Sequence, residues 1–168
     1  MIMTIVNYED FERTFGFDIP NKLKYIDKNG PPRTHIAFLK NERTNKLLAY
    51  GEEKRIHQPT CEDVRNKFHA EQALLYNINK VRNKVNPNEW RGPKTIISAR
   101  FSKCGFIGNS KFCSSCAKLL LKKCSSYVDY VAYFENKNLC KVPIKNICKD
   151  TTYSTSLQYR HNLRSMNA

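Results

Sequence analysis

Two short segments of the sequence carry residue types that bind metal ions, and they constrain the fold more than any other feature. His69 and Glu71 flank Ala70 in the first segment, and Cys113 and Cys116 enclose two serines in the second. One imidazole and two thiolates provide three protein ligands for a tetrahedral zinc ion and leave the fourth position to water, as in catalytic zinc sites. A fold that uses these residues must bring the two segments together.

The first segment lies within a run of apolar residues at helical spacing. The run consists of Val64, Phe68, Leu74, Leu75, Ile78, Val81 and Val85. Positions i and i+2 of a regular helix point about 200° apart, so His69 and Glu71 cannot face one site from the middle of a helix. They can do so from its first turn. We therefore predict a helix that begins near His69, preceded by a separate turn or short helix at residues 60–67.

The second segment predicts another helix N-terminus. Cys113 and Cys116 are three positions apart and therefore lie on one face of a helix, which apolar residues extend through Leu120 and Cys124. The N-terminus of a helix favours the thiolate form of cysteine. Both ligand segments are thus expected at the starts of helices.

Five short apolar runs around these helices have the composition of β-strands. They are residues 35–39, 46–50, 94–101, 127–134 and 139–142. The first two are joined by a polar segment and predict a β-hairpin. The last two are separated only by residues 135–138 and must pair antiparallel, because a parallel crossover needs about a dozen residues or more. The segment Asn7–Gly16 predicts a short helix that packs through Phe11 and Phe15.

Length and composition indicate one domain of ordinary size. The chain has 168 residues without an internal repeat or linker, so we expect a single domain at residues 1–149 and a polar, basic tail at 150–168. No apolar run approaches the roughly 20 residues that span a bilayer, and the N-terminus lacks the features of a signal peptide. We therefore expect no membrane association and an intracellular location, in the cytoplasm or nucleus.

The seven cysteines are expected to be reduced. Their number is odd and no export signal accompanies them, which favours thiols and a metal over disulfides. We expect the five cysteines outside the candidate ligand set to be small buried apolar residues. They are Cys61, Cys104, Cys124, Cys140 and Cys148. The pattern assigns no role to His35 or His57.

The order His69, Glu71, Cys113, Cys116 resembles that of the zinc-dependent cytidine deaminase-like superfamily, whose pattern is H-x-E followed by P-C-x-x-C. The chain departs from this pattern at Phe112, where the family usually has proline, and in the long segment between the two motifs. The resemblance implies an α/β fold, a three-layer α-β-α sandwich with a mixed central sheet of about five strands. The antiparallel pairing of the last two strands is similar to that of the nucleoside-deaminase and bacterial toxin-deaminase branch.

The resemblance also implies a chemistry and a set of residues. One Zn²⁺ per chain would be held by the imidazole and the two thiolates, and Glu71 would act as the general acid/base of hydrolytic deamination. The backbone N–H of Ala70 would hold the carbonyl of the base, and the backbone carbonyl of Lys111 would accept from its amino group. Cytosine, converted to uracil, is the expected base, although adenine fits the same His-Ala-Glu motif.

The net charge of +14 is concentrated in the C-terminal half. Residues 1–90 contain 15 Lys and Arg against 12 Asp and Glu, whereas residues 91–168 contain 14 against 3. Such a surplus fits a phosphate-binding face, with a Lys-rich solvated surface as the alternative explanation. We predict that single-stranded nucleic acid contacts Arg100, Lys103 and Phe106, in and beside a long loop at 102–112.

Three functions remain open at the level of the sequence. The first is a deaminase of cytosine within single-stranded DNA or RNA, which the basic half and the long loop favour. The second is a salvage enzyme that deaminates free cytidine, deoxycytidine or a nucleotide. The third is a catalytically inert, zinc-stabilised module that binds nucleic acid, which the replacement of proline by Phe112 leaves open.

Overall fold

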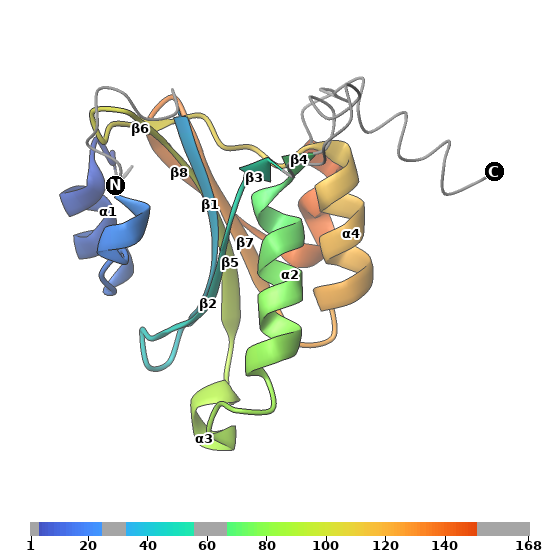
Figure 1. Cartoon of the computed structure of the whole chain (residues 1–168). Helices are drawn as coiled ribbons and strands as arrows, with labels where there is room; N and C mark the ends of the chain where they lie inside the picture. Colours follow the sequence, from blue (N-terminus) through green and yellow to red (C-terminus); the bar gives the residue numbers. More distant parts are fainter. Residues whose placement is uncertain (1–3, 25–32, 56–66, 151–168) are drawn as a thin grey trace.

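The computed structural model describes residues 4–24, 33–55 and 67–150 (Figure 1). The turn predicted at 60–67 and the tail predicted at 150–168 lie outside these residues, except for Lys67 and Asp150. His57 also lies outside them. Within the described residues, no helix is long and apolar enough to cross a membrane.

A mixed sheet of six strands forms the centre of the molecule, in the order β2-β1-β5-β7-β8 with the short β6 paired to β5. Its strands are β1 (Arg33–Asn41), β2 (Leu47–Glu52), β5 (Lys94–Ser102), β6 (Ile107–Gly108), β7 (Tyr130–Glu135) and β8 (Asn138–Pro143). β5 and β7 run parallel, and the other neighbouring pairs run antiparallel. A separate ribbon pairs β3 (Lys54–Arg55) with β4 (Lys67–Phe68). The predicted hairpin and the antiparallel last two strands are confirmed.

Helices cover both faces of the sheet and complete three layers (Figure 1). They are α1 (Tyr8–Phe15), η1 (Asn21–Leu23), α2 (Ala70–Val81), α3 (Pro87–Trp90), α4 (Ser114–Cys124) and η3 (Ile144–Asp150). α1 and η1 pack on one face, and α2, α4 and η3 pack on the other. The expected three-layer α-β-α sandwich with a mixed sheet is therefore confirmed.

α1 forms between two capping residues. The side chain of Asn7 accepts a hydrogen bond from the backbone N–H of Asp10, and Gly16 ends the helix with φ 74°, a left-handed conformation that favours glycine. Phe11 is buried at the centre of an aromatic core, where five other phenylalanine rings have centroids 4.6 to 5.9 Å away. The predicted short helix and its packing side are confirmed.

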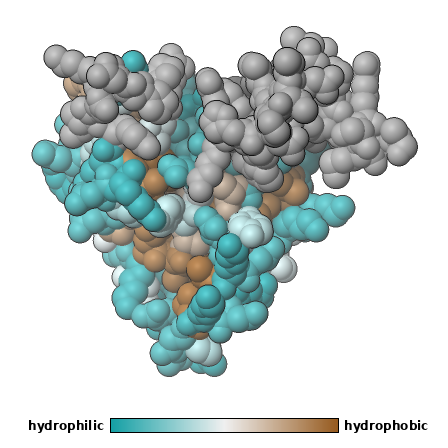
Figure 2. Space-filling view, viewed as in Figure 1, coloured by the Kyte–Doolittle hydropathy of each residue, from teal (hydrophilic) through white to brown (hydrophobic). Residues whose placement is uncertain are grey.

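The two sides of the sheet carry separate hydrophobic cores. Figure 2 shows hydrophilic residues over the outer parts of the helical layers and hydrophobic residues between these layers. On β1, Ala37 belongs to the core beneath α2 and α4 and Ile36 to the core beneath α1. Because side chains alternate along a strand, His35 also faces α2 and α4, and the same alternation on β5 places Ser98 and Arg100 on this face. These polar residues therefore lie on the side of the sheet that carries both ligand segments.

β7 begins three residues later than its sequence predicts. The strand expected at 127–134 begins at Tyr130, because the backbone N–H groups of Tyr127 and Val128 both donate to the carbonyl of Cys124. Residues 127 and 128 therefore close the last turn of α4 instead of extending the strand. The loop expected between β5 and α4 likewise contains β6, which folds back onto β5.

The prediction that the remaining cysteines are buried is wrong for two of them. Cys124 is buried at the end of α4 and Cys140 is half-buried, but Cys104 and Cys148 are exposed. Cys104 lies in the turn between β5 and β6, outside both cores. Cys61 lies outside the described residues.

β2 and α2 approach each other closely at Gly51. A Cβ atom on this residue would lie 2.2 Å from the backbone nitrogen of Leu74 and 2.7 Å from the backbone oxygen of Ala70. Both atoms belong to the backbone of α2 and cannot move without moving the helix. The side chain of Asn77 donates to the carbonyl of Tyr50 over 2.7 Å. Gly51 therefore sets how closely α2 packs on the sheet.

We expect Gly51→Ala to destabilise the protein by about 1–3 kcal/mol or more, because an added methyl group at a close contact forces the backbone apart. Gly108→Ala is the matched control, since a Cβ atom there would lie 3.8 Å from its nearest neighbour, in ordinary van der Waals contact. Urea unfolding of the two variants measures the difference in the free energy of unfolding. Equal unfolding midpoints would contradict the close approach of β2 and α2.

Candidate metal centre

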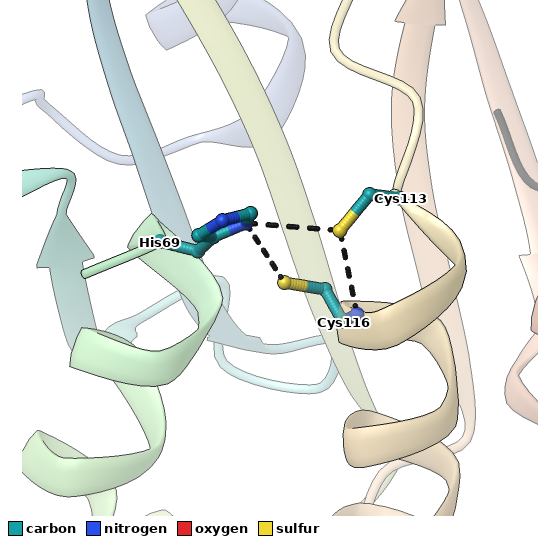
Figure 3. A group of neighbouring side chains, drawn as sticks. All are labelled: His69, Cys113 and Cys116. Carbon is teal, nitrogen blue, oxygen red and sulfur yellow. Dashed lines mark hydrogen bonds between the residues drawn. The ribbon is translucent and has the colours of Figure 1, made fainter. Parts of the chain in front are cut away.

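His69 is the residue at which α2 begins. Its backbone is extended, with φ −65° and ψ 150°, and its N–H donates to Oε1 of Gln72, 3.0 Å away. Its carbonyl accepts from the N–H of Ala73 and closes the first turn. The imidazole therefore projects from the end of the helix toward α4 (Figure 3). The predicted helix start near His69 is confirmed.

Cys113 begins α4 in a similar way. Its Sγ accepts from the backbone N–H of Cys116, 3.4 Å away, and lies 3.0 Å from Oγ of Ser115. Cys116 follows one turn later on the same face of the helix and is buried. Both sulfur atoms are thus held at the N-terminus of α4, where thiolates are favoured.

A buried serine fixes the chain just before this helix. Oγ of Ser110 donates to the carbonyl of Ser98 over 2.6 Å and accepts from the N–H of Phe134 over 2.9 Å. Ser98 is in β5 and Phe134 is in β7, so Ser110 ties the segment to both parallel strands. The position of Cys113 relative to the sheet follows from this attachment.

The three candidate ligands converge from the two helix ends (Figure 3). Nδ1 of His69 lies 3.7 Å from Sγ of Cys113 and 3.4 Å from Sγ of Cys116. Tetrahedral zinc, with Zn–S of about 2.3 Å and Zn–N of about 2.0 to 2.1 Å, requires about 3.6 Å between nitrogen and sulfur. All three ligand atoms lie within 4.8 Å of one another. The donor types and the spacing therefore fit one metal ion.

The three side chains perturb one another's protonation. Hydrogen bonds from Cys116, His69 and Ser115 lower the pKa of the Cys113 thiol to about 3. The hydrogen bond with Cys113 raises the pKa of His69, and Cys113 together with burial raises the pKa of Cys116. A metal needs both thiols deprotonated and the imidazole neutral, so binding releases the remaining protons and weakens as the pH falls.

Glu71 lies in the first turn of α2 and is only 2% exposed. Burial raises the pKa of its carboxyl group above the usual range. Oε1 lies 3.5 Å from Nε2 of His35, and Oε2 has no hydrogen-bond partner among the described residues. A buried polar atom without a partner is costly. Oε2 is therefore an oxygen available to a water molecule or ligand at the site.

His35 is a residue of the site that the sequence pattern did not reveal. It is 6% exposed on β1, and its Nε2 lies 2.9 Å from Oγ of Ser98. Burial, followed by the nearby charges of Arg100 and His69, lowers the pKa of His35 well below its usual range, so the ring is neutral near pH 7. The alternation of side chains on β1 was the one sequence signal available for it. This alternation predicts which face of the sheet His35 lies on, but it does not predict that Glu71 and Ser98 are its neighbours.

The predicted substrate contacts lie at the two helix starts. Ala70 is the first residue of α2 and is fully buried. Lys111 is half-buried two residues before Cys113, and its Nζ lies 5.9 Å from the centre of the Tyr133 ring. This is a cation–π contact, so the Lys111 side chain rests on β7.

The predicted nucleic-acid contacts divide between two places. Arg100 is half-buried on β5 and stands directly opposite His35 in the register of the sheet. Lys103 is half-buried in the turn after β5, and Phe106 in the same turn is 52% exposed and forms a backbone bridge with Asn7. The structure thus brings Arg100 to the face with the candidate ligands, whereas Lys103 and Phe106 lie at the end of β5 beside the start of α1.

No protein-family model matches the sequence, and no curated protein matches it. The fold and the site therefore define the class of protein on their own. It is a mixed α/β protein in which His69, Cys113 and Cys116 lie close enough together to hold one metal ion.

We expect the purified protein to bind one zinc ion per chain. Cys113→Ala and Cys116→Ala should each abolish binding, whereas Cys104→Ala, at an exposed cysteine outside the group, should not. Metal analysis after titration with a chelator measures this. Chelation should also lower the melting temperature of the unmodified protein, because part of the binding free energy is folding free energy. Zinc retained after replacement of both ligand cysteines would contradict the assignment.

Proposed function

We propose that this chain is a zinc-dependent hydrolytic deaminase that converts cytosine to uracil within single-stranded DNA or RNA. One observation supports it above the others. The buried carboxylate of Glu71, with one unpartnered oxygen, lies beside a His-Cys-Cys group built from two helix starts. This is the donor set and the acid/base group that hydrolytic removal of an amino group from a base requires. The resemblance of the motif order to the cytidine deaminase-like superfamily agrees with it.

The residues of the chain have separable tasks in this reaction. His69, Cys113 and Cys116 would hold the zinc ion, which lowers the pKa of a bound water toward neutrality when present. Glu71 accepts a proton from the attacking water and delivers it to the ring nitrogen of the base. It then transfers the second proton of the water to the departing amine. The C–O bond forms, the C–N bond breaks, ammonia leaves, and Glu71 returns to its starting state.

The surroundings of Glu71 suit these transfers. A general acid/base works best when its pKa lies near the working pH, and burial moves the pKa of this carboxyl in that direction. Oε2 has no hydrogen-bond partner among the described residues, so it is the atom of Glu71 that can accept and release the proton. Low exposure also excludes bulk water from the transfer.

We expect Glu71→Gln to retain zinc and the fold while deamination falls by about 10²–10⁴-fold, the usual contribution of general acid/base catalysis. Glu89→Gln makes the same chemical change in α3, at the far end of α2, and should leave the rate unchanged. Uracil formation and ammonia release from a cytosine-containing oligonucleotide measure the rate. Activity within about tenfold of the unmodified protein would place the acid/base elsewhere, and loss of zinc would make Glu71 a ligand.

The charge distribution favours a polynucleotide as substrate. A free nucleoside has no phosphate and a mononucleotide has one, so neither uses the 14 basic against 3 acidic residues of positions 91–168. Arg100 lies on the face of the candidate ligands, and the exposed ring of Phe106 offers a stacking surface, worth about 1–3 kcal/mol per base. Single strands are preferred because extracting a base from a duplex costs a few kcal/mol.

We expect the affinity for a single-stranded oligonucleotide to fall steeply with salt, with a slope of about −0.7 in log K against log salt for each phosphate contacted. Lys103→Ala combined with Lys111→Ala should reduce the magnitude of that slope by about 1.4 if both side chains contact phosphates. Lys122→Ala combined with Lys123→Ala removes equal charge from exposed positions near the end of α4 and is the matched control. Fluorescence anisotropy over a salt series measures both.

Three outcomes of these experiments would change the proposal. Efficient turnover of free cytidine with none of an oligonucleotide would indicate a salvage enzyme. Zinc and oligonucleotide binding without turnover of cytosine or adenine in any substrate would indicate an inert binding module. Equal loss of affinity in the test and control variants would show a diffuse electrostatic attraction instead of specific contacts by Lys103 and Lys111.

A further inference from the structure

His35 lies on the sheet at the first turn of α2 and joins two buried polar groups. Its Nε2 is 2.9 Å from Oγ of Ser98 and 3.5 Å from Oε1 of Glu71. Ser98 is fully buried on the adjacent strand, and its carbonyl accepts from Oγ of Ser110. The imidazole is thus fixed on the sheet side of the Glu71 carboxylate.

The carboxylate of Glu71 has two other neighbours of a different kind. They are the backbone N–H of Glu71 itself and the thiol of Cys116. A thiol that binds a metal loses its proton and with it the ability to donate. His35 is not one of the candidate metal ligands, so metal binding takes no proton from it.

The protonation of His35 suits the same role. Burial keeps its pKa low and its ring neutral, so one ring nitrogen carries a proton and the other does not. Ser98 has a hydroxyl group that can accept as well as donate. With the proton on Nε2, the N–H donates to Oγ of Ser98 over 2.9 Å, and Oε1 of Glu71 lies beside it, 3.5 Å from Nε2.

We propose that His35 is a positioning residue, whose Nε2–H attracts Oε1 of Glu71 toward the sheet and leaves Oε2 as the oxygen that exchanges protons. The role of His35 in catalysis rests on the proposed deaminase function. The contact between His35 and Glu71 can be tested independently of that function. A carboxylate turns about its last bond, so fixing one oxygen orients the other. Misplacement of a reacting group by about 1 Å can cost about 10²-fold in rate.

The contact is tested by ¹⁵N NMR of the histidine rings in the full chain, with zinc bound and after chelation. We expect His35 to carry its proton on Nε2, and both Glu71→Gln and Ser98→Ala to shift that nitrogen. Glu89→Gln, in α3, is the control and should not shift it. A proton on Nδ1, or an Nε2 signal that Glu71→Gln leaves unchanged, would overturn the inference.

The catalytic consequence is tested with two substitutions of His35. His35→Leu should lower kcat by about 10- to 100-fold, as for other residues that orient an active group, with little change in KM or zinc content. His35→Gln should restore most of the loss, because its amide nitrogen reaches the position of Nε2. Ile36→Val, on the same strand but on the opposite face, controls for weakening of β1.

A double-mutant cycle separates positioning from general stabilisation. If His35 acts through Glu71, His35→Leu should cause no further loss of kcat in the Glu71→Gln background. Additive losses, or a His35→Leu rate equal to that of Ile36→Val, would overturn the inference while deamination by the unmodified protein upholds the proposed function. Coupled NMR signals in a protein that deaminates no substrate would overturn the function and leave the His35–Glu71 contact established.

Discussion

The packing of α2 against the sheet is the constraint on which the site depends. Gly51 lacks the Cβ atom that would otherwise meet the backbone of α2, and the side chain of Asn77 donates to the carbonyl of Tyr50 on the same strand. These contacts fix both the distance and the rotation of the helix. Because of that rotation, Glu71 is buried against the sheet, while His69, one residue before the helix, faces α4 (Figure 3).

The parallel pair β5 and β7 brings the second ligand segment to the first. Parallel neighbours need a crossover, and α4 forms the helical part of it. Such crossovers are nearly always right-handed, which leaves one face of the sheet to α4, the face that α2 covers (Figure 1). The two helix starts then meet, and their unpaired N–H groups favour anions there. Topology therefore assembles the His-Cys-Cys group from residues that local sequence cannot bring together.

The features predicted correctly from the sequence are those that obey local rules. Apolar runs located the strands, and the requirement that His69 and Glu71 face one site placed the helix start. The position of His35 beside Glu71, by contrast, does not follow from a local rule. It depends on β1 lying beside β5 with His35 opposite Arg100, a pairing of distant segments that the alternation on β1 cannot give. The prediction that Cys104 is buried is wrong for a related reason. Its exposure follows from the turn that pairs β6 with β5, which the local sequence does not predict.

Phe112 is the position at which the chain differs from the P-C-x-x-C pattern that it resembles, and its packing restrains the backbone as a proline would. Proline restricts the backbone through its ring, which holds φ at about −65°. Phe112 is 1% exposed in the core beneath α2 and α4, with its ring edge-to-face to Tyr133 at 6.0 Å. Burying such a side chain contributes about 1.5–3 kcal/mol, and moving Cys113 would withdraw the ring from the core. Ser110 is also attached to β5 and β7, so tertiary packing holds the segment before Cys113 in place without a proline ring.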